Sequence, residues 1–335
     1  MKAVLLQEDP QAKLLVTDVP IPELKEGEAL VKIKTAALNH RDQWCREGMY
    51  PGLRYPSILA SDGCGIVEKV ANEADQAWLG KSVVMNPNVN WGSHPDFQSF
   101  NYNILGMPSN GTLSEYLAIP VHRLHEKPAF LSDEEAAALP LAGLTAYRAL
   151  FNKGEAQSGH KVLITGIGGG VALFALQFAV AIGAEAYVTS SKPEKIEKAI
   201  ELGAKGGSNY REEKWYKDVI KQYPFGFNVV IDSAGGPDFA QIAKMMAMGG
   251  NMVVYGTTAG TPSPIHLPRL FFSQANIKGT TMGNDQEFKE MLDFVEKHEI
   301  HPVISSIRPI DEAISAFDEM AAGKQFGKLV IRVAD

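Results

Sequence analysis

The sequence predicts an α/β protein of two domains, one built mainly of β-strands and one built around a doubly wound parallel sheet. The chain has 335 residues, more than one hydrophobic core usually organises. Short strands broken by proline and glycine occupy the first part, to about residue 123, as in an all-β or barrel-like domain. From residue 161 onward strands and helices alternate, which is typical of a doubly wound parallel sheet.

The chain before residue 161 is expected to hold six short strands and three helices. The strands are predicted at 2–6, 14–19, 29–36, 65–70, 81–85 and 111–119. Residues 38–49 carry a row of polar groups and predict a loop that leads into a short helix, whereas 86–107 has no hydrophobic period and indicates an irregular surface loop. Helices are predicted at 131–138 and 141–151. Ser132 and Glu135 form the pattern of a capping box at the start of the first of these helices.

Residues 161–183 predict a buried strand, a glycine-rich turn and an apolar helix. Gly168, Gly169 and Gly170 remove the Cβ atoms that would keep a diphosphate from the N–H groups at the helix start. The strict pattern G-x-G-x-x-G fails, because aligning Gly169 as its middle glycine puts Ile167 first and Ala172 last. A tight turn in a protein that binds no nucleotide is therefore the alternative interpretation.

The rest of the chain completes the parallel sheet and then returns. Strands are predicted at 186–189, 228–231, 252–255 and 277–279, with helices at 193–202, 214–221 and 238–248. The helices expected at 286–298 and 311–322, and the strand at 328–333, follow the completed sheet and are expected to rejoin the first domain. The domains predicted are therefore 1–125 with 285–335, and 126–284.

Composition excludes several classes of partner and of chemistry. With 32 basic and 39 acidic residues the net charge is −7, and no basic block suits a nucleic acid. Since no apolar run reaches the ~20 residues that span a bilayer, and the start lacks a signal-peptide core, we expect a soluble cytoplasmic protein without membrane contact. The two cysteines, Cys45 and Cys64, exclude a four-thiolate zinc lobe. No G-x-S-x-G, H-E-x-x-H or P-loop motif supports a hydrolase or a kinase.

Nine motifs in a fixed order are more specific than any one of them. They are LNHRD at 38–42, SDGCGIV at 61–67, GTLSEY at 111–116, LPLAGLTAYRAL at 139–150, the glycine-rich turn, ELGAKGGSNYRE at 201–212, VVIDSAGG at 229–236, VVYGTTAG at 253–260 and FGKLVIR at 326–332. With them the chain resembles the zinc-lacking, quinone oxidoreductase-like branch of the medium-chain dehydrogenase/reductase superfamily. The resemblance implies a GroES-like β domain, a Rossmann domain, a cleft between them and commonly a homodimer formed by sheet-to-sheet contact.

The resemblance also indicates that no metal is used. Zinc-dependent relatives place a cysteine where this chain has Asn39 and a histidine where it has Ser61. An amide and a hydroxyl are poor substitutes for thiolate and imidazole, so the metal site is predicted to be lost. His122 and His125 stand three residues apart, but we interpret them as a surface pair.

The cofactor implied by the resemblance is a nicotinamide dinucleotide, and the second strand of the predicted sheet favours NADP(H). That strand ends without an Asp or Glu to bind the ribose diol, whereas Ser190, Ser191 and Lys192 or Lys195 suit a 2′-phosphate. A simple helix-capping loop is the alternative. Tyr210 matches a family position beside the phosphate, and the other positions assigned to the cofactor are Asn39, Thr145, Gly168, Gly169, Gly170, Val171, Gly256, Thr257, Thr281, Met282 and Gly283.

Asn39 and Tyr50 are the residues we predict to carry catalysis. Both match family positions around the substrate cleft, as do Asp42, Trp44 and Arg46, and both can donate a hydrogen bond. For Asp42 and Arg46 a local i, i+4 helix pair is an equally fair interpretation. The function predicted is NADPH-dependent reduction of quinones or of α,β-unsaturated ketones and aldehydes without zinc. The alternatives are a zinc-free alcohol dehydrogenase or carbonyl reductase, and an NADPH-binding protein with little activity.

Overall fold

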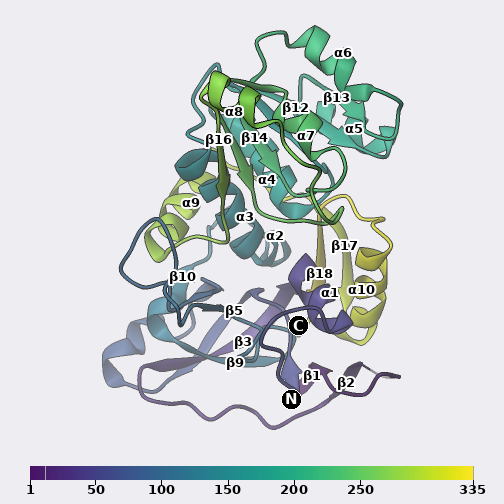
Figure 1. Cartoon of the computed structure of the whole chain (residues 1–335). Coiled ribbons are helices and arrows are strands. Elements are labelled where there is room, and N and C mark those ends of the chain that lie inside the picture. The colour runs from purple at the N-terminus through teal and green to yellow at the C-terminus, as the bar shows by residue number, and fades with distance from the viewer. Residues whose placement is uncertain (12, 335) are drawn as a thin grey trace. The chain divides into compact units, whose positions relative to one another are not determined.

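The computed structural model describes residues 1–11 and 13–334, which form two compact units. The first unit comprises Met1–Ala142 and the segment from Gly283 to the chain end, and the second unit comprises Gly143–Met282. Figure 1 shows the second unit in teal to green and the two chain-terminal parts of the first unit in purple to blue and in yellow.

The first boundary between the units lies after Ala142, and the prediction of a boundary after residue 125 is corrected accordingly. Helix α2 (Asp133–Ala138) packs on strands β3 (Glu28–Ala37) and β5 (Asp62–Val70) of the first unit. Thr35 Oγ1 donates to the carbonyl of Asp133 at 2.7 Å. The segment 126–142 therefore belongs to the β-rich part of the chain.

Strands from the end of the chain complete the main sheet of the first unit. Its strand order is β10-β6-β5-β3-β18-β17, and β9 also pairs with β3. The members not yet given are β6 (Ser82–Met85), β9 (Tyr116–Pro120), β10 (Leu124–Glu126), β17 (Ile304–Pro309) and β18 (Lys328–Arg332). Strand β18 runs antiparallel to β3, with Val330 opposite Ala37, which confirms that the last strand returns to the first domain.

Smaller elements complete the first unit. A second sheet has the order β2-β1-β4, with β1 (Lys2–Leu6), β2 (Leu14–Asp18) and β4 (Ser57–Ile58), and β7 (Asn88–Val89) pairs with β8 (Asn103–Ile104). The helices are α1 (His40–Glu47), α9 (Asp285–Lys297) and α10 (Ala313–Ala321). Helices α1 and α10 contact each other although they lie far apart in the sequence, as their purple and yellow ribbons show (Figure 1).

Gly111 allows two backbone segments to approach very closely at one end of this unit. A Cβ atom on Gly111 would stand 1.8 Å from the carbonyl oxygen of Ala60, so no other residue fits without moving the backbone. Gly111 N donates to Ile58 O at 2.8 Å, and Ala60 itself has a positive φ of 66°. This contact fixes the backbone just before Ser61 and Asp62.

The second unit is a six-stranded, all-parallel sheet of order β13-β12-β11-β14-β15-β16, which confirms the predicted doubly wound sheet. The strands are β11 (Lys161–Ile164), β12 (Glu185–Ser190), β13 (Gly206–Asn209), β14 (Phe227–Asp232), β15 (Met246–Val254) and β16 (Asn276–Gly279). The helices are α3 (Pro140–Tyr147), which begins in the first unit, α4 (Gly170–Ala181), α5 (Pro193–Glu201), α6 (Trp215–Gln222), α7 (Phe239–Ala243) and α8 (Leu267–Ser273). Helix α4, almost wholly apolar, packs on β11 and β12.

Three predictions of secondary structure are wrong at their ends. The helix expected at 238–248 ends at Ala243, because Met246 already pairs with Phe227 in the sheet. The strand expected at 111–119 begins only at Tyr116, and the helix expected at 141–151 continues from Arg148 as a π-helix. Helix α8 and strands β4, β7, β8, β10, β13 and β17 were not predicted.

The capping box of α2 gives a direct test of this part of the fold. Ser132 Oγ accepts from Glu135 N at 3.2 Å, and Glu135 Oε2 accepts from Ser132 N at 2.9 Å. Because Ser132→Ala leaves a helix-terminal N–H without its side-chain acceptor, it should lower the free energy of unfolding by about 1 kcal/mol in urea titrations followed by tryptophan fluorescence. The control is Ser93→Ala, at an exposed bend. Equal stability of the two variants would contradict the assignment.

Candidate cofactor and substrate sites

The glycine-rich turn joins β11 to α4 and presents open backbone at the start of that helix. Gly166 and Gly168 have φ values of 65° and 129°, which side chains with a Cβ rarely adopt. A Cβ atom on Gly169, the residue that precedes α4, would meet nothing within 4 Å. The 12-residue helix α4 has no acidic side chain in its first turn, where Gly170 and Val171 lie. These features suit a phosphate group at the helix N-terminus.

The end of β12 forms a closed polar turn in the same unit. Ser190 Oγ accepts from Lys192 N at 3.1 Å, and Ser190 O accepts from Tyr210 N at 3.1 Å. Ser190 is buried, Ser191 is half-buried, and Lys192 lies directly before α5, which has Pro193 in its first turn. The N-cap residue of α5, Lys192, makes no side-chain hydrogen bond that caps the helix, whereas the turn still offers hydroxyl groups that suit a phosphate.

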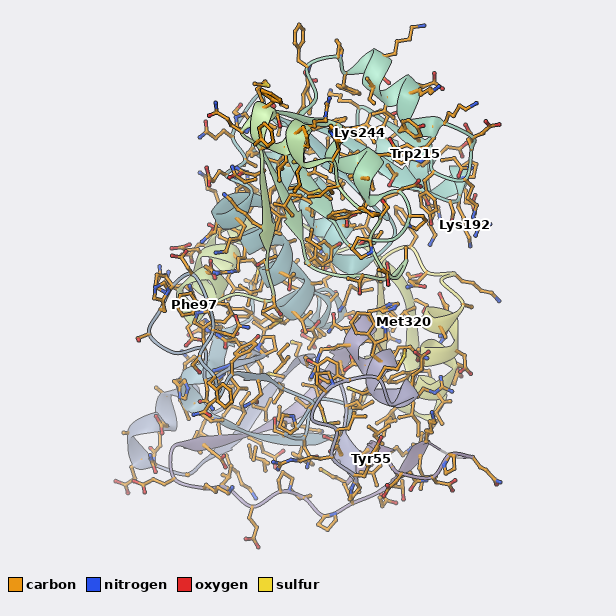
Figure 2. The ribbon with its side chains drawn as sticks, in the orientation of Figure 1. Tyr55, Phe97, Lys192, Trp215, Lys244 and Met320 are labelled. Carbon is orange, nitrogen blue, oxygen red and sulfur yellow. The ribbon has the colours of Figure 1, made fainter. Side chains whose placement is uncertain are left out.

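Lys195 extends from the first turns of α5 to the glycine-rich turn. Its Nζ lies 3.0 Å from the position that a Cβ on Gly168 would occupy. Burial, followed by the nearby ammonium of Lys192, lowers the pKa of Lys195 below its ordinary value. Lys192, by comparison, lies at the edge of the second unit in Figure 2. The structure therefore brings Lys195 next to Gly168.

The remaining positions assigned to the cofactor are divided between the units. Thr145 is buried on α3, with its Oγ1 3.9 Å from the sulfur of Met282. Gly256 and Thr257 follow β15, and Thr281 and Met282 follow β16, so these four residues leave parallel strands at their carboxyl ends, where open sheets bind ligands. Gly283, Asn39 and Tyr50 belong to the first unit.

Asn39 lies in a buried cluster of charged and polar side chains in the first unit. Its Nδ2 donates to Asp62 Oδ2 at 2.8 Å, and its Oδ1 accepts from Lys328 Nζ at 2.6 Å. Lys328 Nζ also donates to Asp62 Oδ2 at 2.9 Å, and Asp62 Oδ1 accepts from Leu141 N at 2.8 Å. Every side chain in this triangle is buried. One hydrogen of the Asn39 amide has no partner in this set of bonds and is the group that a ligand could use.

Asn39 is also the N-cap residue of α1, and its place at the start of this helix fixes where its side chain lies in the cluster. Asp42 Oδ2 accepts from Asn39 N at 2.8 Å, as a capping box requires. Asp42 is completely buried, and its Oδ1 has no hydrogen-bond partner among the described residues, with Arg41 Nη1 3.8 Å away. Burial raises the pKa of Asp42 above its ordinary value.

Tyr50 is held in the same unit by Arg41. The guanidinium carbon of Arg41 stands 4.6 Å from the centre of the Tyr50 ring, and Arg41 Nε donates to the Tyr50 hydroxyl at 3.3 Å. Because that hydroxyl accepts from Arg41, its own hydrogen is directed elsewhere and can be donated. The local pair of Asp42 and Arg46 does not form, since Arg46 Nη1 binds Asp318 Oδ1 at 2.7 Å instead.

The positions that hold zinc in relatives do not fit a metal ion in this chain. Ser61 Oγ accepts from Arg41 Nη1 at 2.7 Å and donates to Leu105 O at 2.7 Å, and Asn39 Oδ1 already binds an ammonium. A zinc ion on these oxygens would stand beside two fixed positive charges. Burial also raises the pKa of Cys45 to about 12, so it is no ready thiolate. Among the described residues, no group of three or more His, Cys, Asp or Glu side chains could hold a metal.

Lys328, Arg41 and Asp62 are members of these clusters that could not be assigned to the site from the sequence. Lys328 was seen only as part of a predicted strand, and Arg41 only as part of a polar row. The available signal was a lysine at the start of an otherwise apolar strand, since a charge predicted to be buried requires a partner of opposite charge. Asp62, in the motif at 61–67, was the complementary signal.

Two family models and a curated relative identify the family. The alcohol dehydrogenase GroES-like domain matches 25–129, and the zinc-binding dehydrogenase domain matches 170–297. The zinc-type alcohol dehydrogenase-like protein YogA of Leptosphaeria maculans is 38% identical, over 96% of this chain and 94% of its own. The chain belongs to the medium-chain dehydrogenase/reductase superfamily. The predicted superfamily and fold class are thereby confirmed, and the chain is an oxidoreductase of this superfamily, whose members bind a nicotinamide cofactor.

Two further similar proteins have names that describe different reactions within the superfamily. A solved NAD-dependent alcohol dehydrogenase is similar with a TM-score of 0.92 and 33% identity, covering all of both chains. The 2-methylene-furan-3-one reductase of Solanum lycopersicum is 31% identical over 95% of this chain and 74% of its own. Within 1–11 and 13–334 no helix combines the length and the apolar character needed to cross a bilayer.

The hydrogen bonds of Asn39 and Ser61 predict that the purified protein carries no stoichiometric zinc and keeps its activity in the presence of a chelator. The physical reason is the lack of thiolate and imidazole ligands together with the two cations on Asn39 and Ser61. Elemental analysis checks this, with a zinc-dependent alcohol dehydrogenase handled in parallel as the control. One zinc per chain, with activity lost to the chelator and restored by zinc, would overturn it.

Proposed function

We propose that this oxidoreductase reduces quinones or α,β-unsaturated carbonyl compounds with NADPH and without zinc. The observation that carries the proposal is the pair of neutral donors, the spare N–H of Asn39 and the O–H of Tyr50, in a unit whose former metal positions are filled by hydrogen-bonded side chains. The name of the tomato relative, a 2-methylene-furan-3-one reductase, describes a conjugated ketone and supports the same substrate class.

The mechanism follows from what neutral donors can stabilise. When bound, the nicotinamide cofactor supplies the hydride. Asn39 and Tyr50 donate hydrogen bonds to the substrate oxygen, where negative charge develops in the transition state. In an enone or a quinone that charge is delocalised into an enolate or a hydroquinone anion, which an amide and a phenol can support, whereas a simple ketone gives a localised alkoxide. Tyr50 or water then supplies the proton to the product.

The residues of the second unit support NADPH rather than NADH. No acid stands between Thr189 and Lys192 to bind a ribose diol, and Lys195 adds positive charge beside the glycine-rich turn. Ser190 and Ser191 supply hydroxyl groups in the same segment, and Tyr210, which follows β13 and whose N donates to Ser190 O, supplies a third. The NAD-dependence in the name of the solved relative belongs to that protein, so the preference proposed here rests on the residues of this chain.

Lys195→Ala should weaken NADPH binding about tenfold or more and leave NADH binding unchanged. Loss of one charge-assisted contact to a phosphate costs about 1.5–3 kcal/mol. Calorimetric titration of both cofactors measures the effect. The matched control is Lys205→Ala, because Lys205 is exposed and precedes β13, at the end of the sheet opposite the strands' carboxyl ends. Equal affinity of the unaltered protein for NADPH and NADH would contradict the proposed preference.

Asn39→Ala should lower kcat with an enone about a hundredfold without abolishing NADPH binding. In well-studied oxyanion sites one lost donor costs about 2.7–4 kcal/mol of barrier. Tyr50→Phe should also lower kcat, whereas Tyr55→Phe, at an exposed tyrosine, serves as the control. Steady-state rates with a panel of quinones and enones measure these effects. Unaltered rates in both Asn39→Ala and Tyr50→Phe would show that the assignment of donors is wrong.

A zinc-free alcohol dehydrogenase or carbonyl reductase is the second candidate function. The alcohol dehydrogenase name of the solved relative favours it. Analysis of the product of an enal separates the two candidates, because a saturated aldehyde reports reduction of C=C and an allylic alcohol reports reduction of C=O. Binding of NADPH without oxidation across the whole panel would instead favour the third alternative, a binding protein with little activity.

We further propose a homodimer joined through the second unit, in a cytoplasmic setting. Strand β16 is the last strand in the order of the parallel sheet. Next to it in sequence, α8 exposes three large apolar side chains, Leu267, Phe271 and Phe272, the last 74% exposed. An edge strand beside exposed aromatic groups suits pairing with a second copy.

A further inference from the structure

Lys328 is a buried cation in direct contact with the proposed donor Asn39. It lies at the first position of β18, its residue is only 4% exposed, and its Nζ reaches Asn39 Oδ1 at 2.6 Å and Asp62 Oδ2 at 2.9 Å. Asp62 Oδ2 in turn accepts from Asn39 Nδ2 at 2.8 Å. The three side chains therefore form a closed triangle of hydrogen bonds.

The triangle allows only one orientation of the Asn39 amide. An ammonium is only a donor and an ionised carboxylate is only an acceptor. If the amide were turned over, its NH₂ group would face Lys328 at 2.6 Å and its oxygen would face Asp62 at 2.8 Å. Both contacts would then be repulsive. The charges of Lys328 and Asp62 thus determine where the remaining N–H of Asn39 points.

We propose that Lys328 is a positioning residue for catalysis, which orients and polarises the Asn39 amide as a hydrogen-bond donor. The inference deepens the proposed function and rests on the role of Asn39 in it. A charge-assisted bond to Oδ1 draws electron density from the amide and strengthens its N–H as a donor, since hydrogen bonds in series reinforce one another. Lys328 itself touches no reacting atom in this scheme, so its effect reaches the substrate only through Asn39.

A kinetic double-mutant cycle tests this route. Lys328→Met should lower kcat for an enone about tenfold, within the range that contacting pairs show in such cycles. In the Asn39→Ala background the same substitution should have no effect on kcat, because the group on which Lys328 acts is gone. An equal fold-loss in both backgrounds would show that Lys328 acts independently of Asn39 and would overturn the proposal.

A charge-balanced variant separates positioning from folding. Lys328→Met alone leaves the carboxylate of Asp62 buried without its cation, which can destabilise the unit. The double variant Lys328→Met/Asp62→Asn removes both charges, and the Tm of each variant reports folding. A charge-balanced variant that folds with the unaltered Tm and is as active as the unaltered protein would contradict the proposal. Loss of kcat at an unaltered Tm would support it.

The side-chain ¹⁵NH₂ resonance of Asn39 tests the same point without any turnover. It is identified as the signal missing in Asn39→Ala. It should shift in Lys328→Met and stay in place in Lys34→Met, a matched control in which a partly exposed lysine 3.8 Å from Asp133 is removed. An unmoved Asn39 signal in Lys328→Met would overturn the positioning role. If the unaltered protein reduces no carbonyl compound, the proposed function fails, while this spectrum still decides the role of Lys328.

Discussion

A single buried carboxylate, that of Asp62, holds together the segments that form the polar cluster of the first unit. Its two oxygens accept from the backbone of Leu141, from the amide of Asn39 and from the ammonium of Lys328. An isolated charge in such a place would cost several kcal/mol, so its partners have to be present for the unit to fold as it does. The start of α3, the cap of α1 and the start of β18 are thereby tied to one point.

Much of the fold could be predicted, because the positions of many strands and helices follow from short sequence patterns. The strand at 2–6 has the predicted bounds, and α2 begins within two residues of the predicted position. The beginning of β15 was missed, since Met246 resembles the end of a helix and becomes a strand only by pairing with Phe227. Tertiary pairing here outweighs the local preference.

The candidate site was less predictable than the fold for a similar reason. The resemblance pointed to Asn39 and Tyr50 as isolated donors. Their geometry depends on Lys328 and Arg41, and the partner of Lys328 lies 266 residues earlier in the chain. No local period records such a pairing. Family membership likewise does not determine whether this chain binds zinc. The name of the matching domain, zinc-binding dehydrogenase, describes the family, whereas this chain has Asn39 and Ser61 at the expected ligand positions.

Because β18 pairs with β3, the first unit cannot be completed until the end of the chain has been synthesised. The second unit is fully translated once Met282 has been added, whereas the first unit still lacks the strand that carries Lys328. Domains fold as units while the ribosome extends the chain, so the parallel sheet can form while Asp62 is still without its cation. The first unit is therefore the last to be completed, and a nascent chain that stalls before residue 328 would hold a folded parallel sheet beside an unfinished β domain.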